Sequence, residues 1–122
     1  MSVRHLNQSN HIEKLVSVLI KDFTDYPDWA ITTTFYFAMH RMQAALLKDF
    51  HFNPDKHLHP LRQRSRNTLV SIHYAAIANS YMKLFHESMK ARYVPGYQLT
   101  TKMVDITKDI ENALVEFKQY PK

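Results

Sequence analysis

The chain has 122 residues, of which 45% are hydrophobic and 22% charged, so it has the size and composition of one globular domain and not those of a disordered segment. Its formal net charge of +5 at pH 7 permits an anionic partner, and nucleic acid is the commonest of these. With one glycine and no cysteine, it excludes glycine-rich phosphate loops, disulfides, thiolate catalysis and cysteine-ligated zinc. We therefore expect a single domain over residues 1–122.

The N-terminal stretch MSVRHLNQSNH lacks the apolar segment of a signal peptide, so we expect no secretory leader. No apolar run approaches the roughly 20 residues that cross a bilayer as a helix, so we expect no membrane partner. The absence of cysteine fits a reducing compartment. These features together predict a cytoplasmic protein.

The first predicted helix covers residues of about 10–24. Asn10 is a good N-cap, and Glu13 three residues later completes the pattern of a capping box. The TDYPD cluster is expected to end the helix. Apolar residues recur between these points at helical spacing, namely Ile12, Leu15, Val16, Leu19, Ile20 and Phe23.

The second predicted helix follows Asp25, which we expect to be its N-cap, with Pro27 and Asp28 in the first turn. The run Trp29–Phe50 contains no helix breaker and carries more apolar side chains than one narrow stripe needs. We therefore expect this helix to be central, with neighbours on more than one side. The pair His40–Arg41 in its middle is interpreted as an interface or groove position.

The stretch HFNPDKHLHP is predicted to be a loop because it contains two prolines and an Asn-Pro-Asp turn signal. A third helix is predicted from about residue 61 to about 93, where the VPGY stretch ends it. Thr100 or Thr101 is expected to cap a fourth helix that runs to about Phe117. Its apolar stripe consists of Met103, Ile106, Ile110, Ala113, Leu114 and Phe117.

Four amphipathic helices joined by short connections predict an all-α fold, an antiparallel up-and-down four-helix bundle. The long second and third helices are expected to form its spine. No segment shows the sustained alternation of a strand.

The segment HLHPLRQRSRNTLVSIH (residues 57–73) is the most cationic part of the chain. Arginine binds phosphate through a planar fork of donors, so this segment is the candidate contact for phosphate or nucleic acid. The alternative is an ordinary solvated helix face. The candidate phosphate-binding residues are His57, Arg62, Arg64, Arg66 and Asn67.

Arg66 and His73 form the candidate catalytic pair. Their spacing is two helical turns with a drift of about 20°, so both side chains can share one side of a helix. The histidine could deprotonate a 2′-hydroxyl or protonate a leaving oxygen, while the arginine stabilises charge on the phosphate, without a metal. The alternative is a partly buried His73 with one hydrogen-bond partner.

Two further patterns are weaker indications of a functional site. His57 and His59, with Asp55 nearby, form a His-x-His that could ligate a metal, but no third ligand stands at a fixed spacing, and we predict no metal and no cofactor. Tyr93 and Tyr97 could stack on bases beside Lys90 and Arg92, or could simply close one end of the bundle.

Three stretches of the sequence resemble the HEPN domain family. DWAITTTFYFAMHRMQAALL is similar to the family's second helix, where a tryptophan precedes a tyrosine-rich run. KHLHPLRQRSRN resembles its histidine-containing loop, and YMKLFHESMKARY resembles the end of its next helix. These stretches occur in the same order as in the family, and the final amphipathic helix also fits. The resemblance covers roughly residues 25–120.

The resemblance implies an all-α bundle, commonly a homodimer, of the kind found in toxin–antitoxin, phage-defence and nucleotidyltransferase-linked systems. Many members are metal-independent RNases whose motif, an arginine and a histidine separated by four to six residues, is brought together from two protomers. RNTLVSIH matches this motif with Arg66, Asn67 and His73. The family's motif usually lies near the start of the last core helix, whereas here it lies in the third predicted helix.

Two functions stay open. One is a HEPN-like domain that engages RNA or nucleotide through the basic segment, with RNA cleavage by Arg66 and His73 as its catalytic form. The other is a non-catalytic helical dimerisation or interaction module that pairs with an antitoxin or a nucleotidyltransferase. Nucleic-acid binding without catalysis is a third interpretation, and it predicts an affinity that falls steeply with salt.

Overall fold

The structure is a computed structural model in which residues 2–22, 25–52 and 59–122 are described, with only the backbone described for Ser2, Asp22 and residues 59–62. This part of the chain is all-α and contains no strand, as predicted. Its helices are α1 (Ser2–Asp22), α2 (Pro27–Phe50), α3 (His59–His73), α4 (Ala75–Tyr93), α5 (Tyr97–Thr100) and α6 (Met103–Lys118).

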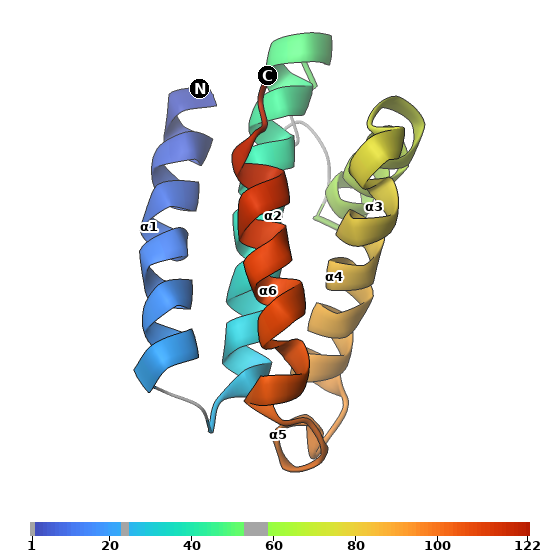
Figure 1. The fold of residues 1–122 in the computed structure, drawn as a ribbon. Helices are drawn as coiled ribbons and strands as arrows, with labels where there is room; N and C mark the ends of the chain where they lie inside the picture. Colours follow the sequence, from blue (N-terminus) through green and yellow to red (C-terminus); the bar gives the residue numbers. More distant parts are fainter. Residues whose placement is uncertain (1, 23–24, 53–58) are drawn as a thin grey trace.

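The four long helices α1, α2, α4 and α6 lie lengthwise beside one another (Figure 1). From the N-terminus, α1 runs down the view of Figure 1, α2 runs up, α4 runs down and α6 runs up again. Helix α2 packs against α1, α4 and α6, so the prediction of a central second helix is confirmed. Helix α3 packs mainly on α4 and more lightly on α2, and the short α5 closes the turn between α4 and α6.

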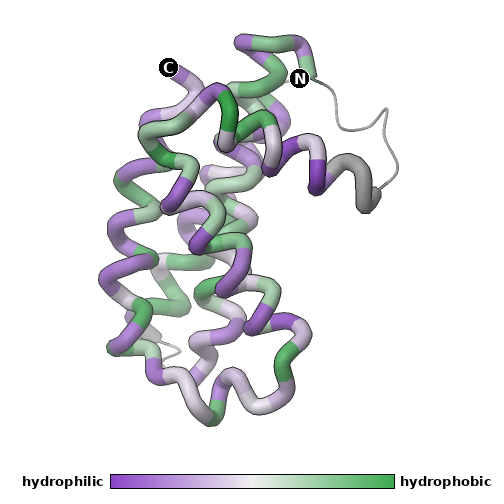
Figure 2. The backbone as a smooth tube through the Cα atoms, turned by 90° about the vertical axis from the view of Figure 1, so that its right-hand side faces the viewer, coloured by the Kyte–Doolittle hydropathy of each residue, from purple (hydrophilic) through white to green (hydrophobic). Residues whose placement is uncertain are grey.

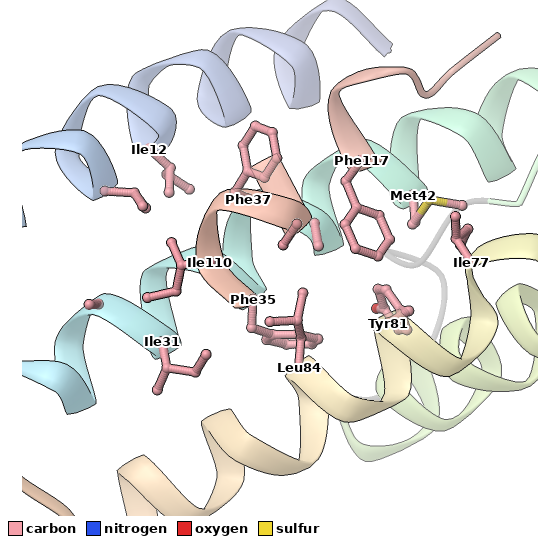
Figure 3. Close-up of a cluster of buried hydrophobic side chains, with 14 of the residues drawn as sticks. Ile12, Ile31, Phe35, Phe37, Met42, Ile77, Tyr81, Leu84, Ile110 and Phe117 are labelled. Atoms are coloured by element: carbon pink, nitrogen blue, oxygen red, sulfur yellow. The ribbon is translucent and has the colours of Figure 1, made fainter. Parts of the chain in front are cut away.

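The core lies between these helices and takes side chains from α1, α2, α4 and α6. Figure 3 shows them converging from all four helices, with Phe37 of α2 and Phe117 of α6 among the largest that are fully buried. Burying a side chain of this size contributes roughly 1.5–3 kcal/mol, so the core supplies most of the folding energy. The tube in Figure 2 alternates between apolar and polar residues around successive helical turns, as expected of helices with one buried stripe.

Helix α1 begins earlier than predicted, at Ser2 and not at Asn10. Asn10 is therefore not an N-cap. Its side-chain oxygen accepts a hydrogen bond from Arg41 Nη2 at 2.6 Å, and Ser9 Oγ accepts one from Arg41 Nε at 2.9 Å. These contacts hold the first half of α1 against α2, which explains how a polar sequence with little apolar periodicity stays helical there. The predicted end at residue 24 lies outside the described residues.

Helix α2 begins at Pro27, but its N-cap is Tyr26, which makes no side-chain capping bond, so the prediction of an Asp25 cap is wrong. Pro27 itself presets the first helical turn. The helix ends when His51 adopts a left-handed conformation with φ of 53°. Its N–H donates to the Leu47 carbonyl at 3.1 Å, which closes the last turn.

The single third helix predicted over residues 61–93 is two helices, because Tyr74 interrupts it with φ of −126° and ψ of 57°. The Tyr74 hydroxyl donates to Asp49 Oδ2 at 2.6 Å, and its ring packs edge-on against Phe50 and Tyr120. All three partners are distant in sequence. The local sequence contains no breaker, so only these tertiary contacts explain the break.

The last part of the chain follows the prediction with two corrections. Gly96, with φ of 83°, forms the turn after α4 at the predicted VPGY break. The turn continues into α5, which was not predicted. The N-cap of α6 is Lys102 in an extended conformation, so neither Thr100 nor Thr101 caps this helix. Among the described helices, none is long and apolar enough to cross a lipid bilayer.

Candidate functional site

Arg66 lies on α3 with its side chain half-buried against α2. Its Nε donates a hydrogen bond to Oε1 of Gln43 at 3.0 Å, and the Gln43 side chain is only 2% exposed. Within the described residues no carboxylate comes within ion-pair distance of the Arg66 guanidinium. A cation in a partly dry environment without a counter-charge is an unusual feature, because charges of this kind are normally paired.

Two buried polar groups lie near Arg66. They are Nε2 of Gln43, which has no hydrogen-bond partner, and the hydroxyl of Tyr81, a fully buried residue of α4. Burial raises the pKa of Tyr81 to about 12, and the nearby positive charge of Arg66 opposes part of that rise. Arg66 opposes the rise also as a hydrogen-bond donor, so its guanidinium faces the Tyr81 oxygen.

His40 of α2 is the histidine that shares the electrostatic environment of Arg66. Its Nδ1 lies 2.8 Å from Nδ1 of His5 on α1, so one ring donates and the other accepts. Burial lowers the pKa of His40 to about 4, assisted by the charges of His5, Arg66 and Arg4. His40 is therefore neutral at pH 7. The electrostatic influence of Arg66 on His40 was not predicted, because the two residues belong to different helices and no local pattern links them.

The remaining predicted phosphate-binding residues fall into two groups. Arg64 is exposed and, with Asn67, lines an open pocket between α3 and α4 that Phe85 and Met89 also line. The side-chain oxygen of Asn67 is buried there without a hydrogen-bond partner. His57 lies outside the described residues, and for Arg62 only the backbone is described. The structure therefore brings Arg64 and Asn67 together at this pocket, whereas Arg66, about half a turn around the helix from Arg64, faces α2.

His73 is the last residue of α3 and is exposed. Its ring stacks on Phe50 of α2, with centroids 4.0 Å apart and planes inclined by 27°. Helical rise separates Arg66 from His73 by roughly 10 Å along the axis, and no hydrogen bond joins these two described residues. Their cooperation in catalysis stays a prediction.

Arg41, the neighbour of His40, has a structural role. Its side chain is 8% exposed and crosses from α2 to the end of α6, where Nη1 donates to the carbonyls of Lys118 and Tyr120 at 3.4 and 3.3 Å. Its other nitrogens bind the α1 residues Ser9 and Asn10. Arg41 therefore joins three helices and is not available to a ligand.

The tyrosines proposed to stack on bases behave differently from each other. Tyr97 is buried, with its hydroxyl donating to Glu87 at 3.4 Å, so it belongs to the closed end of the bundle. Tyr93 is exposed, and the guanidinium of Arg92 lies 5.3 Å from its ring centre and 5.7 Å from that of Tyr36. Arg92, which lies on α4, is therefore a cation flanked by two aromatic rings.

The described part of the chain contains no cluster of three histidine or acidic side chains that could hold a metal ion. Of the His-x-His pattern, His57 and Asp55 lie outside the described residues, and His59 is described only in its backbone.

Comparisons with protein-family models, with curated protein sequences and with solved structures found no match to this chain.

Proposed function

We propose that this chain is a HEPN-like four-helix bundle that binds RNA or nucleotide through the arginines of α3. The observation that supports the proposal most directly is the Arg66 guanidinium, half-buried beside Gln43 and without a carboxylate partner in the described structure. Exposed Arg64 adds a second positive charge one half-turn away on the same helix. The net charge of +5 favours the approach of an anionic strand.

The hydrogen bond to Gln43 gives Arg66 a defined orientation. Gln43 takes the Nε edge of the guanidinium, so the Nη1 and Nη2 groups are the donors that can face a ligand. Phosphate oxygens match this planar pair of donors, and a side chain already fixed in place loses less conformational entropy on binding. Arg66 thus fits a phosphate contact better than a freely rotating surface cation does.

Cleavage of RNA is the catalytic form of this proposal, with the Arg66 and His73 of the family-like motif as its candidate pair. His40 shares the electrostatic environment of Arg66, but a pKa of about 4 makes it a weak base at pH 7, so it is the histidine against which His73 is compared. The experiment incubates single-stranded RNA with the protein in EDTA and compares wild type with the variants His73→Ala and His40→Ala. Equal cleavage by all three proteins, or none by wild type, would exclude both histidines from catalysis.

Binding is tested separately by fluorescence anisotropy with a labelled RNA that carries hydroxyl groups at both ends. Arg64→Ala should weaken binding about three- to tenfold near 0.1 M salt, because one phosphate contact is lost. Lys83→Ala is the matched control, since it removes one exposed cation that pairs with Asp109 between α4 and α6. An equal loss in both variants, or no binding by wild type, would contradict the proposal.

A second candidate function is that of a non-catalytic interaction module, favoured by an open groove between the end of α1 and the start of α6. Ile20 and Val104 line it together with Lys108 and Glu111, and Val104 is 76% exposed. Light scattering at micromolar concentration should give about twice the 14.5 kDa protomer mass if a homodimer forms. Val104→Asp should then lower that mass, and a single-protomer mass for wild type would count against the dimer.

A further inference from the structure

The open pocket between α3 and α4 has one polar wall and one apolar wall. We call it the α3–α4 pocket, and its lining residues are Gln63, Arg64, Asn67, Thr68, Phe85 and Met89. Those from α3 are all polar, and those from α4 are apolar. Each has a partner four positions away on its own helix, so each wall is built from side chains that lie above one another. The pocket volume of about 380 Å³ is within the roughly 300–1,000 Å³ typical of small-molecule sites.

Contacts outside the pocket hold the apolar wall in place. The ring of Phe85 packs edge-on against Phe35 of the core, with centroids 5.6 Å apart and planes inclined by 61°. The sulfur of Met89 accepts a hydrogen bond from Nη2 of Arg92 at 3.3 Å. Side chains that are already fixed lose little conformational entropy when a ligand binds. An aromatic ring beside a polarisable sulfur favours a flat, π-rich ligand.

The polar wall contains an acceptor that no donor of the protein satisfies. The side-chain oxygen of Asn67 is buried and has no hydrogen-bond partner, although such atoms are nearly always paired with protein, water or a bound molecule. Asn67 as a whole is only half-buried and lines the pocket. The last torsion of an asparagine side chain has a broad range, so its amide can turn the oxygen toward a ligand. A ligand with an N–H donor would therefore complete this wall.

A nucleobase has the shape and polarity that the two walls require. It is flat, its faces are apolar enough to stack, and its donors and acceptors lie along its edges. An asparagine amide matches adenine in particular, since its oxygen accepts from the amino group while its nitrogen donates to the adjacent ring nitrogen. Arg64 and Thr68 are exposed at the pocket, and none of the six lining residues is acidic. No lining residue therefore repels the phosphate that a nucleotide brings with its base.

We propose that the α3–α4 pocket binds an adenine base. Phe85 and Met89 contact the face of the ring, and Asn67 pairs with its amino edge. The inference rests on the proposed function, in which Arg64 contacts the phosphate, and it adds a base preference that phosphate contacts alone do not give.

The test is calorimetric titration of the folded protein with adenosine monophosphate and with inosine monophosphate, which carries an oxygen in place of the amino group of adenine. Wild type should bind the adenine nucleotide about tenfold more tightly, the effect expected of one hydrogen bond. Asn67→Leu keeps the shape of the side chain without its amide, so this variant should bind the two nucleotides equally. Asn112→Leu, at an exposed position of α6, is the matched control and should keep the tenfold preference.

The preference for adenine decides whether the pocket reads the base. A preference that disappears in Asn67→Leu and persists in Asn112→Leu supports the proposal. Equal affinity of wild type for the two nucleotides, or no binding of either, overturns it. These two results come from wild type alone, so the proposal can fail even if a variant folds poorly. A preference that Asn67→Leu retains, or that both variants lose, also overturns it.

Titration with adenosine and inosine, which lack the phosphate, separates this inference from the proposed function. If RNA binds in an Arg64-dependent way but wild type does not distinguish the two bases, the proposed function survives and the adenine pocket fails. If wild type prefers adenosine to inosine through Asn67, while Arg64→Ala changes the binding of neither nucleotide nor RNA, the adenine pocket stands and the proposed function fails.

Discussion

At the scale of single residues, two arginines that contact other helices have different roles. All the nitrogen donors of Arg41 point at acceptors within the protein, from Ser9 and Asn10 to the carbonyls at the end of α6. Arg66 donates to Gln43 and faces the Tyr81 hydroxyl, and no backbone carbonyl of the described residues accepts from it. A guanidinium whose donors are all used stabilises the fold, whereas one with donors to spare can bind a ligand.

Arg41→Met should lower the free energy of unfolding by about 2–4 kcal/mol, because it leaves the buried acceptors of α1 and α6 without a donor. Urea denaturation followed by circular dichroism measures the change. The control is Arg64→Met at an exposed position, which should stay within about 0.5 kcal/mol of wild type. An Arg41→Met protein as stable as wild type would show that apolar packing replaces the buried hydrogen bonds in full.

His40 predicts a defined pH dependence of stability. His5 and Arg4 of α1 and Arg66 of α3 face it, and burial with their charges lowers its pKa from 6.5 to about 4. Between these values the unfolded chain binds the proton and the folded protein does not, so stability is highest above pH 6.5 and falls as the pH drops toward 4. The free energy of unfolding should decrease by about 1–2 kcal/mol from pH 7 to pH 5.

Urea denaturation at the two pH values checks this expectation. His40→Gln should remove most of the decrease, while His11→Gln, at an exposed position of α1, should retain it. An NMR titration of the His40 ring should give a midpoint near 4, and a midpoint at 6 or above would contradict the structural explanation.

At the scale of elements, α3 differs from the four long helices in how little of it is buried. Among its described side chains, only Val70 is fully removed from solvent, whereas α2 buries more than half of its length. The Tyr74 break also separates α3 from the hydrogen-bonded ladder of α4. A helix held by few buried contacts opens at lower cost than the core does.

Hydrogen exchange should therefore show faster exchange for the amides of α3 than for those of α2. Val70→Ala should accelerate exchange in α3 further, since it removes the main buried anchor, and should leave the middle of α2 protected. Ile110→Ala, in α6, is the contrasting variant and should raise exchange across the whole core. Protection of α3 equal to that of α2 in wild type would contradict this assignment.

At the scale of the whole molecule, the net charge of +5 sets how binding responds to salt. Neutralising phosphates releases condensed counterions, so the logarithm of RNA affinity should fall linearly with the logarithm of salt concentration. Arg64→Ala should reduce the steepness of that line by about 0.7, the value for one phosphate contact on a single strand. Lys83→Ala should leave the slope unchanged, and a wild-type affinity that does not vary with salt would exclude electrostatic binding.

Much of the helical architecture was predictable from the sequence because its causes are local. The apolar period from Met103 to Phe117 defines α6, Pro27 begins α2, and Gly96 ends the α4 segment because it can adopt a positive φ. The all-α class follows from the same periodicity. The single glycine and the absence of cysteine removed whole classes of site without reference to any fold.

The tertiary structure alone decided the features that depend on residues far apart in the chain. Asp49, Phe50 and Tyr120 produce the break at Tyr74, and Arg41 holds the polar start of α1 in a helix. The contacts of Arg66 with Gln43 and Tyr81 arise in the same way, because the three residues lie on three different helices. Helical periodicity reports only which side of a helix is apolar, whereas the neighbour that each side chain meets is set by how the helices pack.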